Sequence, residues 1–258
     1  MSDAKTMSNG ASGTAEIPLP VFYRQPRPVN AALDAKHSLK AAKGFAFAGS
    51  TNSLVVNAIE FPFAMRSYPI VFTASEPRAA IAVLGITDGE NLFVSKGGAW
   101  AENCYVPAYA RRYPFILMEQ PGSDELLLCL DPSSGLVVES DERPLFQDGK
   151  PSELVQDALV FCREFHGQHL ATMEFLRALA SHNLLTPNEA RVTLNSGQQM
   201  TLRGFEIIDE AKFNALPDEV FLDWRRRGWL HLVYCHLMSM ANWARLVDLS
   251  AQRRPATA

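Results

Sequence analysis

The residues with the clearest chemical potential form an aromatic and basic cluster between positions 68 and 113. Its members are Tyr68, Trp100, Tyr105, Tyr109, Arg111, Arg112 and Tyr113. Rings with a polar tip stack on planar groups, and arginine forms paired hydrogen bonds with anionic groups. The cluster therefore predicts a binding region for a small ligand, a peptide or a partner protein. The alternative is structural, with the rings closing the edge of a sheet and the arginines solvated or paired with carboxylates such as Glu102.

A second candidate is a row of polar side chains near the C-terminus, where His236, Ser239 and Asn242 recur at intervals of three. On a helix this spacing places them roughly along one face. If that face looks into the protein, the row would line a pocket, with His236 as the proton acceptor or donor of an acid–base enzyme. The alternative is that the three side chains are hydrogen-bonded ties within the core.

A third pattern, Cys162, His166 and His169, has the spacing of metal ligands on one helix face. One helix face seldom completes a metal site, and no second ligand pair with metal spacing occurs, so we expect no metal. The sequence also lacks the GxGxxG, GxxxxGK[ST], HExxH and GxSxG motifs. We therefore expect no cofactor, and we expect the four separated cysteines to be reduced.

Composition bounds the class of protein. The 258 residues are 47% hydrophobic and 20% charged, which is enough for a sizeable core. Residues 1–20 are mainly small and polar, so we expect a disordered tail followed by a single domain over residues 21–258. The tail lacks a basic segment followed by an apolar one, which predicts a cytoplasmic protein.

Charge and hydropathy also limit the partners. A net charge of −4 gives no basic excess for a phosphate backbone, so we do not expect nucleic acid to be a partner. No apolar run reaches the length of a spanning helix, so we expect no membrane insertion.

Residues 40–140 have the pattern of short strands, in which apolar runs alternate with turn formers such as Asp88-Gly89. Residues 106–114 interrupt them with a predicted short helix that ends at Pro114. The arrangement predicts a β meander, a mainly antiparallel curved sheet. The predicted strands occupy residues 45–49, 53–61, 68–75, 79–86, 91–95, 115–120 and 125–131.

Residues 150–250 have mainly helical periodicity. A long helix is predicted from Ser152-Glu153 to near Asn183, and a second from Trp229 to about Leu249. A shorter helix is predicted at residues 217–226. The broad apolar faces of the long helices would pack on the sheet, and they would equally fit a homodimer interface.

A hairpin is inserted between these helices, over residues 191–209 around Asn195-Ser196-Gly197. Strands that come first and helices that come later predict an α+β fold rather than a doubly wound parallel sheet.

Five segments carry a resemblance to the SapC family of bacterial proteins. They read MRSYPIVF, ENLFVSKGGAWAENCYVPAYARRYPF, LFQDGKPSE, LRGFEIIDEAKFNALPDE and HLMSMANWARL, and the resemblance extends from about Val21 to Leu249. Family members are often found beside flavin-dependent tryptophan-halogenase-like enzymes, cupin-like proteins and TonB-dependent receptors. The resemblance therefore implies an accessory role in the uptake or modification of an amino-acid-derived or peptide compound.

Two hypotheses follow. The first is a cytosolic accessory or binding protein that recognises a small amino-acid-derived or peptide ligand, or a partner protein, through the aromatic and basic cluster. The second is a metal-independent enzyme that uses His236, with Ser239 and Asn242 nearby, for acid–base chemistry on such a ligand.

Overall fold

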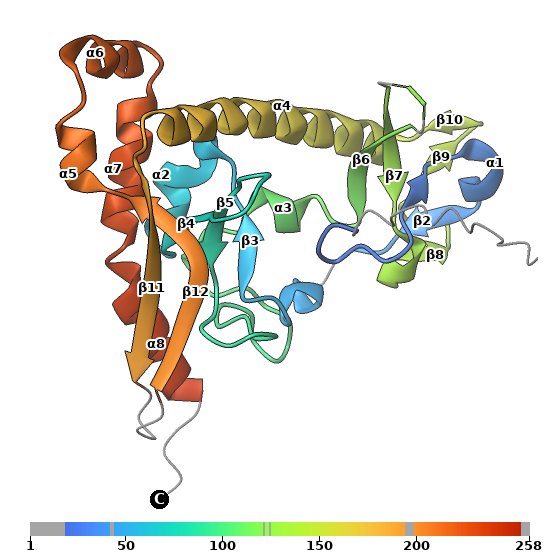
Figure 1. The fold of residues 1–258 in the computed structure, drawn as a ribbon. Coiled ribbons are helices and arrows are strands. Elements are labelled where there is room, and N and C mark those ends of the chain that lie inside the picture. Colours follow the sequence, from blue (N-terminus) through green and yellow to red (C-terminus); the bar gives the residue numbers. More distant parts are fainter. Residues whose placement is uncertain (1–18, 42–43, 121, 124, 194–198, 254–258) are drawn as a thin grey trace, which may run out of the picture.

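The computed structural model describes residues 19–41, 44–120, 122–123, 125–193 and 199–253 (Figure 1). The predicted tail, residues 1–20, lies outside the described residues except for its last two positions. Helices and antiparallel sheets share the chain, so the predicted α+β class is confirmed.

A five-stranded antiparallel sheet forms one end of the molecule. The predicted strand regions 68–75 and 79–86 and the predicted hairpin 191–209 all belong to it, whereas the turn of that hairpin, residues 194–198, lies outside the described residues. The strands, in spatial order, are β11 (Leu185–Thr193), β12 (Gln199–Ile208), β4 (Ile70–Thr73), β5 (Ala80–Val83) and β3 (Ser53–Val55).

The other strands form separate sheets at the opposite end. The predicted strands 115–120 and 125–131 are confirmed as a hairpin, β6 (Phe115–Glu119) and β7 (Leu126–Leu130), whose third strand is β1 (Arg27–Pro28). The single meander that the sequence suggested is therefore divided between two ends of the molecule. Two short antiparallel pairs complete this end, β2 (His37–Leu39) with β8 (Val137–Glu139) and β9 (Phe146–Gln147) with β10 (Lys150–Pro151).

Two predicted strands are wrong, and one side chain explains both. Residues 45–49 contain the 3-10 helix η1 (Ala46–Ala48), and residues 91–95 form a turn followed by a single β-bridge from Val94 to Trp100. The fully buried Asn91 accepts a hydrogen bond from the N–H of Phe93 and donates to the carbonyl of Ala48. Side-chain bonds to backbone groups compete with strand pairing, so the amide of Asn91 stabilises a conformation other than a strand in both segments.

The predicted strand 53–61 stops at Val55. Beyond it the chain forms the 3-10 helix η2 (Ala58–Glu60) and the short helix α2 (Phe61–Ala64), which has Pro62 in its first turn. Proline is favourable there because its fixed φ suits a helix start, whereas in a strand it would remove a ladder hydrogen bond.

The helix α4 (Glu153–Ser181) spans the molecule and connects its two ends (Figure 1). It begins after Ser152 and ends close to Asn183, as predicted. Its C-terminal half contributes Phe175 and Leu176 to the main core, and its N-terminal half contributes Val155 and Cys162 to a second core beside β6 and β7.

The predicted helix from Trp229 to Leu249 is divided into α7 (Trp229–Ser239) and α8 (Asn242–Arg253). The side-chain amide of Asn242 donates to the carbonyls of Met65, Tyr68 and Ser239, so it holds the chain where the first helix ends. The shorter helices α5 (Glu210–Asn214) and α6 (Asp218–Arg226) precede them.

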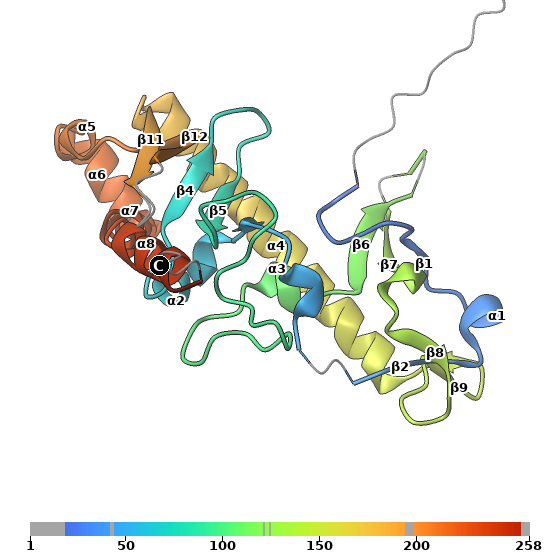
Figure 2. The same ribbon diagram turned by 90° about the horizontal axis from the view of Figure 1, so that it is seen from below.

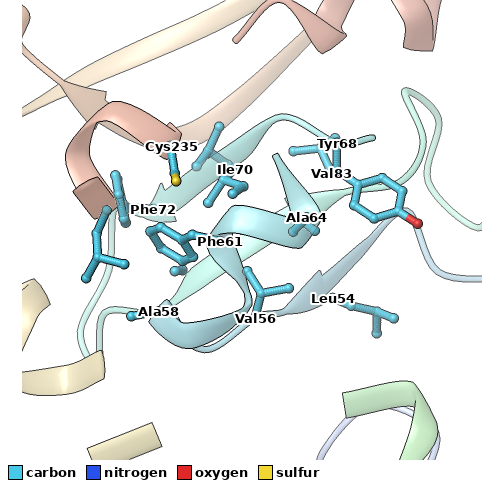
Figure 3. Close-up of a cluster of buried hydrophobic side chains, with 14 of the residues drawn as sticks. Leu54, Val56, Ala58, Phe61, Ala64, Tyr68, Ile70, Phe72, Val83 and Cys235 are labelled. Carbon is cyan, nitrogen blue, oxygen red and sulfur yellow. The ribbon is translucent and has the colours of Figure 1, made fainter. Parts of the chain in front are cut away.

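The main core lies between α2, the strands β3 to β5 and the helices that cover them (Figures 2 and 3). Figure 3 shows the side chains of Phe61, Ile70, Phe72 and Cys235 gathered there, all of them buried. Within the described part of the chain, no helix combines the length and the apolar character needed to cross a bilayer.

Candidate functional site

The predicted aromatic and basic cluster is divided into separate groups by the fold. Tyr68 is fully buried and packs edge-on against Phe93. Its hydroxyl donates to the carbonyl of Tyr105 and accepts a hydrogen bond from Nε1 of Trp100 at 2.8 Å. Tyr68 and Trp100 therefore connect segments of the core. The Tyr68 hydroxyl and the Trp100 indole N–H both form hydrogen bonds within the protein.

A second group surrounds the buried carboxylate of Glu60. Its oxygens accept from the Tyr105 hydroxyl at 3.0 Å, the Ala108 N–H at 2.7 Å and the Asn57 N–H at 2.7 Å. Burial raises the pKa of Glu60, and these hydrogen bonds oppose the rise. The exposed Arg111 donates to the Tyr105 hydroxyl, so this group attaches the short helix α3 (Ala108–Arg111) to η2.

Arg112 forms the centre of a third group. Its guanidinium carbon lies 4.4 Å from the ring centre of Tyr109 and 4.3 Å from that of Phe165, within cation–π distance of both. Burial raises the pKa of Tyr109, and the charge of Arg112 opposes that rise.

No carboxylate of the described residues forms an ion pair with Arg112, and its buried Nε has no hydrogen-bond partner there. The positive charge is therefore held among rings without a counter-ion from the described part of the protein. An anionic group that reached this guanidinium would form a charge-assisted hydrogen bond with it.

A pocket of about 550 Å³ gives access to Arg112. It lies between α3, the start of β6, the segment around Arg143 and the N-terminal half of α4, and we call it the α4 pocket. Phe115 and Phe161 are among its apolar walls. Its charged and polar lining comprises Arg111, Arg112, Arg143, Gln147, Ser152, Glu153 and Asp157.

Of the predicted ligand-binding residues, Arg111, Arg112 and Tyr113 line this pocket, and the ring of Tyr109 contacts the guanidinium of Arg112 without lining the pocket. Tyr68, Trp100 and Tyr105 do not line it. Arg143 could not be singled out from the sequence, because only the tertiary fold brings it into the same pocket as Arg112. The sequence identified Ser152 as the start of a helix, but that pattern does not predict a pocket beside it.

The row His236, Ser239 and Asn242 lines none of the described pockets. His236 and Ser239 are fully buried and Asn242 is half-buried. His236 is fully buried, with Nδ1 2.8 Å from the carbonyl oxygen of Ile70 and Nε2 accepting the N–H of Ile208 at 3.0 Å. Ser239 accepts the N–H of Ile70 at 2.9 Å. Both ring nitrogens are therefore occupied by backbone groups, and burial lowers the pKa of His236 to about 4.

The residues of the third pattern occupy different surroundings on α4. Cys162 is buried at the wall of the α4 pocket, and burial raises the pKa of its thiol to about 11. Burial, together with the charges of His166 and Arg112, lowers the pKa of His169. Among the described residues, no three His, Cys, Asp or Glu side chains lie close enough together to hold a metal ion.

Comparison with known proteins agrees with the segments singled out in the sequence. The family model described as SapC matches residues 29–246, which is most of the chain. The chain belongs to the SapC family. The match includes every element of the α4 pocket. No curated protein and no solved structure matches this SapC chain.

Proposed function

We infer that this SapC protein is a cytosolic accessory or binding protein that holds a small amino-acid-derived or peptide ligand in the α4 pocket. The observation that carries the proposal is Arg112, a cation among aromatic rings at the wall of a pocket, without an ion-pair partner among the described residues. Ligand sites in proteins are typically concave and lined by apolar side chains with a few polar groups that fix orientation.

The size and lining of the pocket agree with such a ligand. A volume of about 550 Å³ lies within the usual range for small-molecule sites. Rings such as Phe115 and Phe161 provide surface for an apolar or aromatic side chain. The arginines provide donors for a carboxylate or an amide oxygen.

Binding is favoured over acid–base catalysis by the surroundings of His236. A catalytic histidine must reach a substrate proton within hydrogen-bond distance. The nitrogens of His236 are both bonded to backbone groups of β4 and β12, at a fully buried position. The residue is therefore better suited to join α7 to the sheet than to perform chemistry on a ligand.

The test is calorimetric titration of the full chain with N-acetyl-L-tyrosine, N-acetyl-L-tryptophan and a set of dipeptides. Wild-type protein should bind members of this set, and Arg112→Gln should weaken binding roughly tenfold or more because a charge-assisted hydrogen bond is lost. The matched control is Arg163→Gln, on the exposed face of α4, which should leave affinity unchanged.

Arg112→Lys is a second variant that keeps the charge, for the case in which the Gln variant unfolds. It should bind more weakly than wild type, since an ammonium group cannot form the bidentate contacts of a guanidinium. A wild-type protein that binds none of these compounds would contradict the proposed function.

A further inference from the structure

The α4 pocket contains a feature that the proposed function does not use, the first turn of α4. This helix is 29 residues long and begins after Ser152, which lines the pocket together with Glu153 and Leu154. The first N–H groups of a helix have no acceptor within the helix, and together they form a partial positive charge. Anionic groups are bound at such ends in many proteins.

Ser152 supplies an independent observation at the same place. Serine at this position normally accepts a hydrogen bond from the second or third N–H of the helix, but the Ser152 side chain makes no such cap. The residue is 7% exposed, and its buried hydroxyl has no partner among the described residues. A buried hydroxyl without a partner is unfavourable, so a ligand oxygen beside Ser152 would remove that cost.

The side chains around Ser152 define the charge of the ligand group. Arg111, Arg112 and Arg143 line the pocket with two acidic residues, Glu153 and Asp157, which leaves one net positive charge in the lining. That balance suits a group with a single negative charge. A phosphate with two charges would exceed this balance and leave one negative charge without a counter-charge in the lining.

We propose that the α4 pocket binds the carboxylate of its ligand at the first turn of α4, between the hydroxyl of Ser152 and the guanidinium groups of Arg112 and Arg143. The assignment rests on the proposed function and narrows it to ligands with a free carboxylate. Arginine supplies paired donors of matching geometry, and the serine hydroxyl and helix N–H groups supply the remaining ones.

The test compares two probes that differ only in this group, N-acetyl-L-tyrosine and its neutral amide. Wild-type protein should bind the carboxylate about tenfold or more tightly than the amide, because a charge-assisted bond replaces a neutral one. Ser152→Ala and Arg143→Gln should each reduce this preference, and the control Arg163→Gln should retain it. Since the Ser152 hydroxyl makes no bond within the described protein, its removal should leave thermal stability nearly unchanged.

The outcomes separate the two proposals. Equal binding of acid and amide, or an undiminished preference in both variants, would overturn the carboxylate site while the binding function stands. Binding of neither probe, together with no binding of N-acetyl-L-tryptophan or of the dipeptides, would overturn both. Inorganic phosphate that displaces N-acetyl-L-tyrosine at lower concentration than acetate does would overturn the assignment to a singly charged group.

Discussion

The Nε2 atom of His236 accepts a hydrogen bond from the N–H of Ile208 at 3.0 Å, across a separation of 28 residues. The other nitrogen, Nδ1, faces the carbonyl of Ile70 at 2.8 Å. An N–H donor on one side and a carbonyl acceptor on the other select the neutral ring with its proton on Nδ1. One imidazole thus joins α7 to two adjacent strands, β12 and β4.

The first prediction concerns the dependence of stability on pH. The pKa of His236 is lowered from 6.5 to about 4 by burial, so protonation favours the unfolded chain. The contribution of the neutral His236 ring to the free energy of unfolding should be fully present above pH 6.5. As the pH falls from 6.5 to 4, this contribution should decrease by about 1.4 kcal/mol per pH unit. Urea unfolding of wild type and His236→Gln at several pH values measures it.

The variant serves as its own control, because every other titrating group is common to both proteins. The difference in unfolding free energy between wild type and His236→Gln should be largest near neutral pH and should shrink toward pH 4. A difference that stays constant over this range would show that His236 is not the neutral, buried group that the geometry requires.

A second prediction concerns the carboxylate of Glu60, which is 3% exposed and accepts hydrogen bonds from three donors. Glu60→Gln replaces one acceptor oxygen with an amide NH2 group, a donor that then faces an N–H or O–H donor. We expect a loss of roughly 2–4 kcal/mol in unfolding free energy. Tyr105→Phe removes only one of these bonds and should cost about 1 kcal/mol in the same denaturation assay, and the reverse order would refute this interpretation.

A third prediction tests the break between α7 and α8. Asn242→Ala removes the amide that donates to Met65, Tyr68 and Ser239, and it should destabilise the protein by about 1–2 kcal/mol. Gln252→Ala, at an exposed position of α8, is the matched control and should have almost no effect. Equal thermal unfolding of the two variants would indicate that the amide is not what holds this corner.

A fourth prediction concerns cysteine reactivity. With a pKa of about 11, only about one Cys162 thiol in a thousand is ionised at pH 8, and the side chain is buried. Cys104 is partly exposed. Brief alkylation of native protein followed by peptide mass spectrometry should therefore detect modified Cys104 long before modified Cys162. Labelling of Cys162 at a comparable rate would contradict the buried position of this thiol.

Local sequence rules predicted the elements with strong periodicity. The extent of α4 follows from Ser152 at its start and from apolar side chains on one face, and the strands β4 and β5 follow from their apolar runs. The same rules failed at Asn91 and Asn242, where one amide side chain bonds to backbone groups remote in sequence. Such bonds depend on the tertiary fold, so a local pattern contains no sign of them.

The residue types of the candidate site could be predicted from the sequence, but which of these residues meet in one pocket could be predicted only in part. Arg111, Arg112 and Tyr113 were singled out because aromatic and basic residues are dense there, and they do line the α4 pocket. Trp100 and Tyr68 are also aromatic side chains with a polar atom. Their polar atoms, however, form hydrogen bonds to each other and to the carbonyl of Tyr105. Arg143 enters through the path of the chain between β8 and β9, which spacing alone does not reveal.

The length of α4 also has a consequence for cooperativity. At 1.5 Å per residue its 29 residues extend roughly 43 Å, and they contribute side chains to the main core and to the second core beside β6 and β7. Detaching the helix from either core would expose apolar surface at that end and remove the support of the other. The two ends of the molecule should therefore unfold together, and free energy released by a ligand at the first turn of α4 would protect the distant sheet from local opening as well.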